Sequence, residues 1–477
     1  MKLNSFFKNA PDIEIQQLSC DSRMPMIDAI FFCIRGVRYN GHDFVKEAIK
    51  NGAKVIIYSE DIDTSYPVIF IRVNDTLDTL NHIAAAFYKN PSKEMENIII
   101  GGNDYRSLTA FTIKKIIDSF DRPCGYIGSM GIYYKDIERL SKAPTLTIIE
   151  NQRILSAMKN AGVLSCCYEM NLSGIELKKL AGVVPESFIY VGTDTDDWEF
   201  TDSETDYCLN YQNYINSLPE TCDVILNGDD PAIRTGNITH DCMTFGFGAG
   251  NDYQARDVKI YPDHTTFLLR YGEEEFEVTT HLLGRNCVYP ILAIIACLTQ
   301  RGYPLDFVLK NLNGFTFPQG YLQNISLGQS FRVIVDQAKN SGALRDLLEY
   351  AKETTDSYHR IIAVYGFNQK SEKSFRQKAI QLLNKYCDML VLTENDSGDR
   401  DPNELNKMFL SNDSIPHVLI EKREEAIFSA LMLANSADCV LLLGKGNEKY
   451  INRSLGNESY AGDSDLAKKY LQQLMNN

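Results

Sequence analysis

The chain has 477 residues, of which 44% are hydrophobic, 23% charged and 10% aromatic. This composition is that of a soluble globular protein and excludes a disordered, collagenous or coiled-coil chain. The length predicts about three domains. Acidic residues outnumber Lys and Arg by 63 to 48, which gives a net charge of −15. Such a surface argues against nucleic acid and anionic membranes as partners, but it leaves room for a local basic pocket.

Apart from the adjacent Cys166 and Cys167, the twelve cysteines lie far apart, several of them within apolar runs such as Phe31–Ile34, and no CxxC pair occurs. This pattern favours buried free thiols in a reducing cytosol over disulfides or a metal site. The N-terminus lacks the apolar core of a signal peptide, and no run approaches the roughly 18 apolar residues of a membrane span. We therefore predict a cytoplasmic protein without membrane insertion.

The first 93 residues alternate strand-like and helix-like patterns. A buried strand is predicted at Ile30–Ile34, a helix at Phe44–Lys50 and a second strand at Lys54–Tyr58. The polar stretch Lys89–Glu94 has the composition of a linker. A small α/β unit is therefore expected at residues 1–93.

A strand, a glycine-containing turn and a helix follow one another next, at Asn97–Ile100, Gly101–Ser107 and Leu108–Phe120. This is the layout of a phosphate-binding loop. Later elements are predicted as strands at Val163–Glu169, Phe188–Val191 and Cys222–Leu226, a pair of antiparallel strands within Asp257–Val278, and a helix at Pro290–Gly302. We expect this central unit to cover residues 94–325.

Apolar runs alternate with helical patterns again in residues 326–477. The predicted strands are Phe331–Asp336, Ile361–Tyr365, Met389–Thr393 and Cys439–Leu443. Strands that alternate with helices through three units predict an α/β fold with largely parallel sheets.

The turn after Ile100 is the first candidate site. A working phosphate loop needs glycines that let the backbone wrap the phosphates, a Lys that reaches them and a Ser or Thr for Mg²⁺. The chain keeps Gly102 and Ser107, but it has Arg106 where the Lys belongs and the bulky Tyr105 before it. A degenerate nucleotide site and a plain turn whose Ser107 caps the helix are both open interpretations.

Several motifs resemble the Mur ligase family, nearest to the UDP-N-acetylmuramoyl-tripeptide synthetases that add the third residue of the peptidoglycan stem peptide. The N-terminal likeness lies in Asp21–Arg23, Phe31–Gly36 and Gly41–Phe44. It continues through Tyr126–Gly131, Asn227–Pro231, Leu283–Arg285, Val333–Asp336 with Ala338, Asp401–Pro402 and Leu443–Tyr450. The order and spacing of these pieces over most of the chain carry the resemblance.

The resemblance implies a small N-terminal domain of the UDP-substrate type, a central ATPase-like domain and a C-terminal Rossmann-like domain. It also implies a reaction in which ATP phosphorylates a peptide carboxylate and an amine then attacks the acyl phosphate, with ATP and Mg²⁺ required. By the same resemblance, Ser22, Arg23 and His42 match the family's pattern near the UDP moiety.

The resemblance further implies a nucleotide site at Gly102, Arg106, Ser107 and Asp336, with Ser107 and Glu169 as metal ligands. Arg106 stands in the position of the family's catalytic Lys.

Other positions depart from the family's pattern as well. Tyr211 stands in the position of a Lys that the family carbamylates, Cys287 replaces an adenine-contacting Asn, and Tyr321 replaces an Arg. Asn395–Gly398 replaces the Asp-Asn-Pro-Arg motif that grips the incoming amino acid, so no Arg is left there to pair with a carboxylate.

These departures predict a Mur-ligase-like pseudoenzyme with lost or strongly reduced ATP-dependent ligation, and we assign no catalytic residue from the sequence. Its role would be accessory, binding a UDP-linked muramoyl precursor or acting as a scaffold for other enzymes of cell-wall synthesis. The alternative is an active ATP- and Mg²⁺-dependent ligase that forms an amide on a UDP-muramoyl peptide or on another carboxylate.

Overall fold

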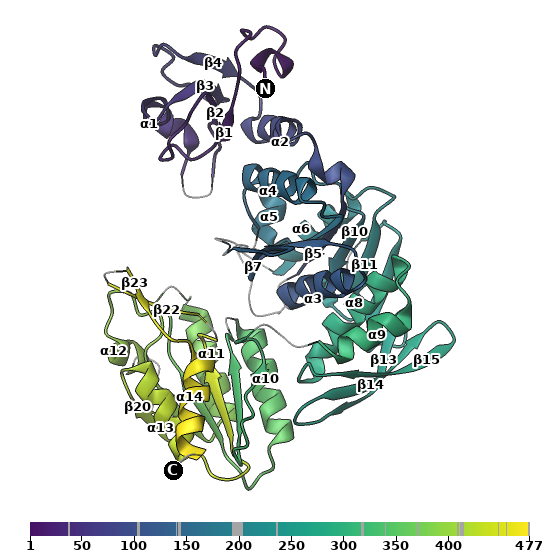
Figure 1. The fold of residues 1–477 in the computed structure, drawn as a ribbon, viewed down its shortest axis with the longest axis vertical. Coiled ribbons are helices and arrows are strands. Elements are labelled where there is room, and N and C mark those ends of the chain that lie inside the picture. The colour runs from purple at the N-terminus through teal and green to yellow at the C-terminus, as the bar shows by residue number, and fades with distance from the viewer. Residues whose placement is uncertain are drawn as a thin grey trace.

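The chain forms three α/β units that follow one another in sequence (Figure 1). The computed structural model describes residues 1–36, 39–102, 105–139, 141, 145–192, 204–234, 237–315, 319–338, 340–369, 371, 373–407, 410, 415–446, 448–454 and 456–475. The N-terminal unit lies at the top of Figure 1, the central sheet in the middle and the C-terminal unit below it. The predicted α/β class with three successive units is confirmed.

The N-terminal unit is a parallel sheet in the order β1-β2-β3-β4. Its elements are β1 (Gln17–Ser19), β2 (Ala29–Phe32), α1 (Val45–Lys50), β3 (Ala53–Tyr58), β4 (Ile69–Arg72) and α2 (Thr76–Phe87). Successive residues of β2 point to opposite faces, so that Ile30 packs in the core beneath α2 and Phe31 in the core beneath α1. The helix predicted from Phe44 is preceded by a 3₁₀ turn at Gly41–Phe44.

The central sheet has the strand order β15-β14-β13-β12-β11-β10-β5-β9-β6-β7-β8. Its strands are β5 (Glu96–Gly101), β6 (Cys124–Gly128), β7 (Gly131–Tyr134), β8 (Ile137–Arg139), β9 (Ser165–Glu169), β10 (Ser187–Tyr190), β11 (Asp223–Asn227), β12 (Cys242–Gly246), β13 (Tyr253–Ile260), β14 (Thr265–Tyr271) and β15 (Glu274–Thr280). Seven neighbouring strands of this sheet are parallel, namely β13, β12, β11, β10, β5, β9 and β6. Antiparallel strands complete both edges, with β14 and β15 at one edge and β7 and β8 at the other.

Helices cover both faces of the central sheet. They are α3 (Arg106–Ser119), α4 (Ile148–Asn160), α5 (Leu172–Glu176), α6 (Glu204–Asn216), α7 (Pro231–Arg234), α8 (Val288–Gln300) and α9 (Leu305–Asn313). Ile98 and Ile100 on β5 pack in a core with α3 and α8, whereas Ile99 packs in a second core with α4 and α6. A strand buried on both faces explains the unbroken apolar run seen in the sequence.

The C-terminal sheet has the order β16-β17-β21-β18-β19-β20 and is parallel except for β16. Its strands are β16 (Gln323–Asn324), β17 (Arg332–Asp336), β18 (Ile361–Tyr365), β19 (Met389–Leu392), β20 (His417–Leu419) and β21 (Cys439–Leu443). The other elements are α10 (Ser341–Thr354), α11 (Lys373–Tyr386), α12 (Pro402–Lys407), α13 (Arg423–Leu433), the hairpin β22 (Tyr450–Arg453) and β23 (Gly456–Ser459), and α14 (Asp463–Met475). Helices α10 and α11 pack on one face of the sheet, and α13 and α14 on the other.

Two details differ from the sequence-based expectation. The segment Asp257–Val278, predicted as an antiparallel pair, holds parts of three strands, β13 to β15. The chain turns at residues 272–273, so that a further strand, β15, begins at Glu274. Strand β16 already belongs to the C-terminal sheet, although it precedes residue 325. The domain boundaries at 93 and 325 stay a prediction.

All twelve cysteines are free thiols, and nine of them are buried. Within the described ranges, no helix combines the length and the apolar character that crossing a bilayer requires.

Candidate active site

The predicted phosphate loop joins the end of β5 to the start of α3, in the middle of the central sheet. Gly102 has a φ of 101°, and a Cβ there would lie 2.5 Å from the carbonyl oxygen of Gly192, so only glycine fits. Asn103 and Asp104 lie outside the described residues. Helix α3 begins at Arg106, and its N-terminal backbone amides therefore stand beside the loop.

Arg106 does not extend away from the loop but folds back into it. Its side chain is buried, its Nη1 donates to the carbonyl oxygen of Gly102, and its Nε donates to Glu169 Oε2 at 3.4 Å. The Glu169 carboxylate therefore neutralises the charge of the buried guanidinium.

Glu169 ends β9, next to β5, and is the centre of a buried polar cluster. Its Oε1 accepts from the Tyr126 hydroxyl and from the Ser129 backbone N–H at 3.0 Å, and its Oε2 accepts from Ser129 Oγ at 2.6 Å. Ser107 Oγ donates to Ser129 Oγ at 3.3 Å. Ser107 and Glu169, the two predicted metal ligands, are thus linked through Ser129. Burial and the Glu169 carboxylate raise the pKa of Tyr126, which therefore stays a neutral donor.

Tyr211 lies directly beneath the loop. It is fully buried, its hydroxyl accepts from the Gly102 backbone N–H at 3.1 Å, and it donates to the carbonyl oxygen of Met170 at 3.3 Å. Its ring packs against Tyr190 and Tyr207, each with 5.0 Å between ring centroids. A phenol cannot carry a carbamate, so this position supports the loop from below instead.

The three residues predicted near a UDP moiety all lie in the N-terminal unit, away from the loop. His42 is buried: its Nδ1 contacts Asn40 Oδ1 at 2.7 Å, and its Nε2 accepts from the backbone N–H of Ser59 at 3.0 Å. Burial lowers the pKa of His42 and so favours the neutral ring. The neutral ring is the form in which Nε2 can accept the hydrogen bond from Ser59.

The other two residues of this group differ in exposure. Ser22 donates from Oγ to Glu47 Oε2 at 2.5 Å and is buried. Arg23 is exposed and forms a two-pronged pair with Asp21 at 2.9 and 2.8 Å. Arg23 is the member of the group that presents its charge to solvent.

Asp336 ends β17 in the C-terminal sheet. It binds the backbone at Leu322, where the chain enters this unit. Its carboxylate accepts from the backbone N–H groups of Leu322 at 2.7 Å and Ala338 at 2.6 Å. Burial raises the pKa of the neighbouring Tyr321, and the carboxylates of Glu169, Asp336 and Glu448 add to the effect. Tyr321 therefore lies within electrostatic range of carboxylates from both the central and the C-terminal unit.

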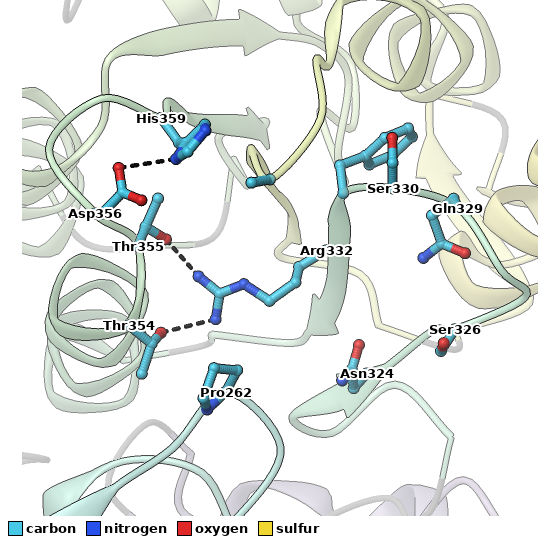
Figure 2. Close-up of a pocket in the computed structure, with 12 residues that line it drawn as sticks. Pro262, Asn324, Ser326, Gln329, Ser330, Arg332, Thr354, Thr355, Asp356 and His359 are labelled. Carbon is cyan, nitrogen blue, oxygen red and sulfur yellow. Dashed lines mark hydrogen bonds and ion pairs between the residues drawn. The ribbon is translucent and has the colours of Figure 1, made fainter.

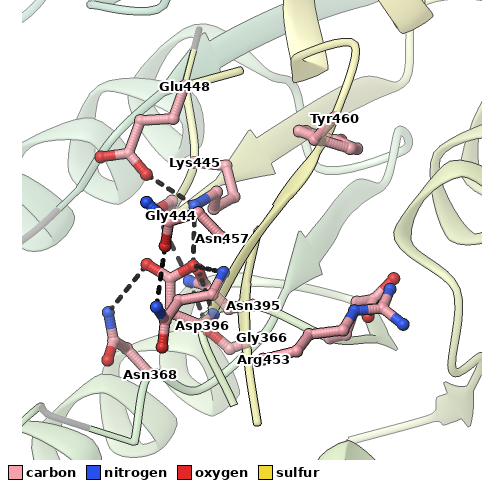
Figure 3. A network of polar contacts seen from close by, with 12 residues as sticks. Gly366, Asn368, Asn395, Asp396, Gly444, Lys445, Glu448, Arg453, Asn457 and Tyr460 are labelled. Carbon is pink, nitrogen blue, oxygen red and sulfur yellow. Dashed lines mark hydrogen bonds and ion pairs between the residues drawn. The ribbon is translucent and has the colours of Figure 1, made fainter. Parts of the chain in front are cut away.

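A second polar network surrounds Lys445, which is fully buried after β21 (Figure 3). Its Nζ donates to Asp396 Oδ1 at 3.0 Å and to Glu448 Oε2 at 2.6 Å, and it lies 4.7 Å from the centre of the Tyr450 ring. Asp396 also accepts from the backbone N–H of Asn452 at 2.8 Å. The segment at 395–398 thus carries a carboxylate paired with a lysine, where the resemblance leads one to expect an arginine.

A cavity of about 340 Å³ lies at the end of β17 opposite to Asp336, and Figure 2 shows residues that line it. Its charged centre is Arg332, which donates to the hydroxyls of Thr354, at 2.7 Å, and Thr355 at the C-terminal end of α10. A cation beside the last turn of a helix is also favoured by the helix dipole. None of the residues that line the cavity belongs to the candidate active site.

Sequence reasoning missed the partners that complete the site. Tyr126 and Ser129 lie in the Tyr126–Gly131 segment that carried the resemblance, but nothing in the sequence shows that their side chains meet Glu169. Among the described residues, no group of three or more His, Cys, Asp or Glu side chains is placed to hold a metal ion.

Three domain families match the chain in order. They are described as the Mur ligase family catalytic domain at residues 14–88, the Mur ligase middle domain at 109–298, and the Mur ligase glutamate ligase domain at 322–446. The three matches follow one another in the same order as the three α/β units. The chain belongs to the Mur ligase family.

Its relatives include tripeptide-forming members of the family. It is 26% identical over 443 residues to the UDP-N-acetylmuramoyl-L-alanyl-D-glutamate–2,6-diaminopimelate ligase of Halalkalibacterium halodurans, covering 92% of this chain and 90% of the relative. It is 28% identical over 452 residues to UDP-N-acetylmuramyl-tripeptide synthetase 2 of Oceanobacillus iheyensis, covering 91% of this chain and 90% of the relative.

Solved structures show the same fold. A UDP-N-acetylmuramoyl-L-alanyl-D-glutamate–2,6-diaminopimelate ligase superposes with a TM-score of 0.69 at 18% identity, over 100% of this chain and 99% of that one. The MurF ligase of Thermotoga maritima, solved with ADP, gives a TM-score of 0.64 at 17% identity, over 97% and 98%. The predicted three-domain Mur ligase architecture is confirmed.

The comparisons do not support the expected loss of activity. The relatives that match nearly the whole chain are named as ligases or synthetases. They therefore favour the alternative prediction, an active ligase, over the pseudoenzyme.

Proposed function

We propose that the protein is an ATP-dependent ligase that joins an amino acid to a UDP-linked muramoyl peptide in peptidoglycan synthesis. One observation carries the proposal: Arg106, Ser107 and Glu169 meet in a single polar cluster at the carboxyl edge of β5 and β9. A cation, a hydroxyl and a carboxylate at the start of a helix are the groups that phosphoryl transfer needs.

The reaction has two steps. A carboxylate oxygen of the muramoyl peptide attacks the γ-phosphorus of ATP, the bond to ADP breaks, and an acyl phosphate forms. The amine then attacks the carbonyl carbon, phosphate leaves with the electron pair of the C–O bond, and the nitrogen loses a proton. In this scheme Arg106 replaces the lysine, turning from Glu169 toward phosphate oxygens that carry more charge.

The residues present fit Mg²⁺. Ser107, Ser129 and Glu169 offer oxygen atoms, the type of donor that Mg²⁺ takes. Bound Mg²⁺ would neutralise phosphate charge in the transition state. Glu169 becomes available to the ion when Arg106 turns to the phosphates, so nucleotide and metal are expected to bind together.

A ligation assay tests the proposal. Full-length protein is incubated with ATP, Mg²⁺, UDP-N-acetylmuramoyl-L-alanyl-D-glutamate and a panel of amino acids that includes 2,6-diaminopimelate and lysine. We expect a condensation product by mass spectrometry and one ADP per product. Arg106→Ala should lower the rate by about 100-fold or more, because a transition-state cation is removed. Arg256→Ala, which removes an exposed cation paired with Glu275, is the matched control.

The proposal would be contradicted if no amino acid gave a product although the protein is folded and a known ligase forms product in the same assay. ADP release that does not depend on the muramoyl peptide would contradict it as well, because the first step requires that carboxylate.

A second candidate function is retention of the UDP-linked precursor without ligation, in support of other cell-wall enzymes. The Arg106–Glu169 ion pair favours it, since both groups are buried and already satisfied. The two candidates differ in thermal shift. A ligase should be stabilised by both ATP–Mg²⁺ and the UDP-muramoyl peptide, whereas a precursor-binding protein should respond to the latter alone.

We further propose that the protein acts in the cytoplasm. Support comes from the thiols, because twelve cysteines that all stay unpaired suit a reducing compartment.

A further inference from the structure

A carboxylate of the C-terminal unit reaches the phosphate loop. Asp346, on α10, accepts a hydrogen bond from the Tyr105 hydroxyl through Oδ2 and one from Asn286 Nδ2 through Oδ1, the latter at 2.5 Å. Tyr105 lies in the loop, and Asn286 lies just before α8 in the central unit. One side chain of the C-terminal unit is therefore held by two donors of the central unit.

The backbone at Tyr105 makes this contact mechanically direct. Tyr105 has a φ of 53°, a left-handed conformation that is costly for a bulky residue. Its carbonyl oxygen accepts from the backbone N–H of Thr109 at 2.8 Å and from Thr109 Oγ1 at 2.9 Å, and these bonds close the first turn of α3. A displacement of the Tyr105 hydroxyl therefore moves the residue directly before Arg106.

The rest of α10 shows how the C-terminal unit is seated. One turn beyond Asp346, the Tyr350 hydroxyl donates to the carbonyl oxygen of Pro262 at 2.7 Å, in the turn between β13 and β14. The Tyr350 Cβ also lies 3.3 Å from the position of a Cβ added at Gly284. Helix α10 therefore rests on the central unit at two places, and the Asp346 contact is the one that includes the phosphate loop.

We propose that Tyr105 is a positioning residue whose hydroxyl, bonded to Asp346, couples the conformation of the phosphate loop to the seating of the C-terminal domain. Because the coupling is an equilibrium property, ligands that favour the Tyr105–Asp346 contact also favour packing of the C-terminal domain on the central unit, and the reverse holds equally. The structural part of this inference stands alone, and its consequence for ligation rests on the proposed function.

Hydrogen exchange measured by mass spectrometry on the full-length protein tests the structural part. We expect Tyr105→Phe to speed exchange by about tenfold in the first turn of α3 and in the first half of α10, because one charge-assisted hydrogen bond is lost. The matched control is Tyr386→Phe. The Tyr386 hydroxyl, on α11, donates at 2.8 Å to Glu349, which lies on α10 like Asp346. This contact stays within the C-terminal unit.

The control should leave exchange in α3 unchanged. If Tyr105→Phe does the same, or if both variants change α3 alike, the inference is overturned. Asp346→Asn provides a second route if Tyr105→Phe folds poorly. Its carbonyl oxygen can still accept from the Tyr105 hydroxyl, so we expect a smaller effect than that of Asp346→Leu, and equal effects would overturn the inference.

The catalytic consequence has its own measurement. In the ligation assay, Tyr105→Phe should lower kcat by about tenfold while changing the KM for the UDP-muramoyl peptide by less than about twofold, since the N-terminal unit is untouched. If Tyr105→Phe shows the expected faster exchange in α3 and α10 but an unchanged kcat, the coupling to ligation is overturned. If the wild-type protein lacks activity, the proposed function fails, and the exchange experiment still decides the structural coupling.

Discussion

At the scale of single residues, the sequence predicts candidate positions but not their partners. Arg106, Ser107 and Glu169 were recognised from their motif, and all three meet at one edge of the sheet. What could not be predicted is that Arg106 turns back onto Glu169, 63 residues away. Rotamers and contacts across strands depend on the packed tertiary structure, which local sequence patterns do not encode.

The carboxyl group of Asp346 predicts a pH dependence of stability. Burial raises its pKa from the ordinary 3.8 to about 6, and hydrogen bonds from Tyr105 and Asn286 offset part of the rise. The adjoining charges are Arg345, which lowers this pKa, and Glu349, which raises it. A raised pKa means that the folded chain binds the proton more tightly, so this group's contribution is fully present below about pH 4 and is lost as the pH rises through about 6.

Urea unfolding at several pH values measures this contribution. A pKa difference of about two corresponds to at most about 3 kcal/mol, and partial exposure of Asp346 reduces it. We expect Asp346→Asn to flatten the change in the free energy of unfolding between pH 4 and 6, relative to the wild type. Glu353→Gln, at an exposed position of the same helix, is the control. A variant with the same pH dependence as the wild type would refute this assignment.

At the scale of elements, short apolar runs were the most informative signal. The strands predicted at Ile361–Tyr365 and Cys439–Leu443 coincide with β18 and β21, because parallel strands buried on both faces are apolar throughout. Only two strands are predicted where β13, β14 and β15 lie, because Glu274, Glu275 and Glu277 make the first half of β15 polar. The neighbours of each strand were not predictable either: β21 lies between β17 and β18, although the chain visits it last.

The pair between α13 and α14 gives a prediction at this scale. Arg423 and Asp463 are both fully buried, and Arg423 donates to the carboxylate from Nε at 2.8 Å and from Nη2 at 2.6 Å. Asp463→Asn leaves a buried guanidinium unpaired and should cost about 3–5 kcal/mol of unfolding free energy. Chemical denaturation checks this value. Asp465→Asn, which breaks an exposed pair with Lys449, should cost less than about 1 kcal/mol; equal losses would contradict the explanation.

At the scale of the whole molecule, composition and motif order together predicted three α/β units, and the fold and family bear this out. Composition alone could not place the units on one another, because their contacts depend on few residues, such as Tyr350 against Pro262. The charge of −15 also has a clearer meaning in the structure. Some of the cations in this balance are paired within the fold, as Lys445 is with Asp396 and Glu448.

The free thiols described above have a practical consequence. Among the twelve cysteines, Cys242, at the start of β12, is the one with an exposed side chain, and nine others are buried. Burial raises the pKa of thiols such as Cys287 and Cys297, which keeps them protonated and slow to react. The protein therefore carries its own attachment point for a fluorescent dye, fixed to the central sheet, from which movements of the C-terminal domain can be followed without removing any native residue.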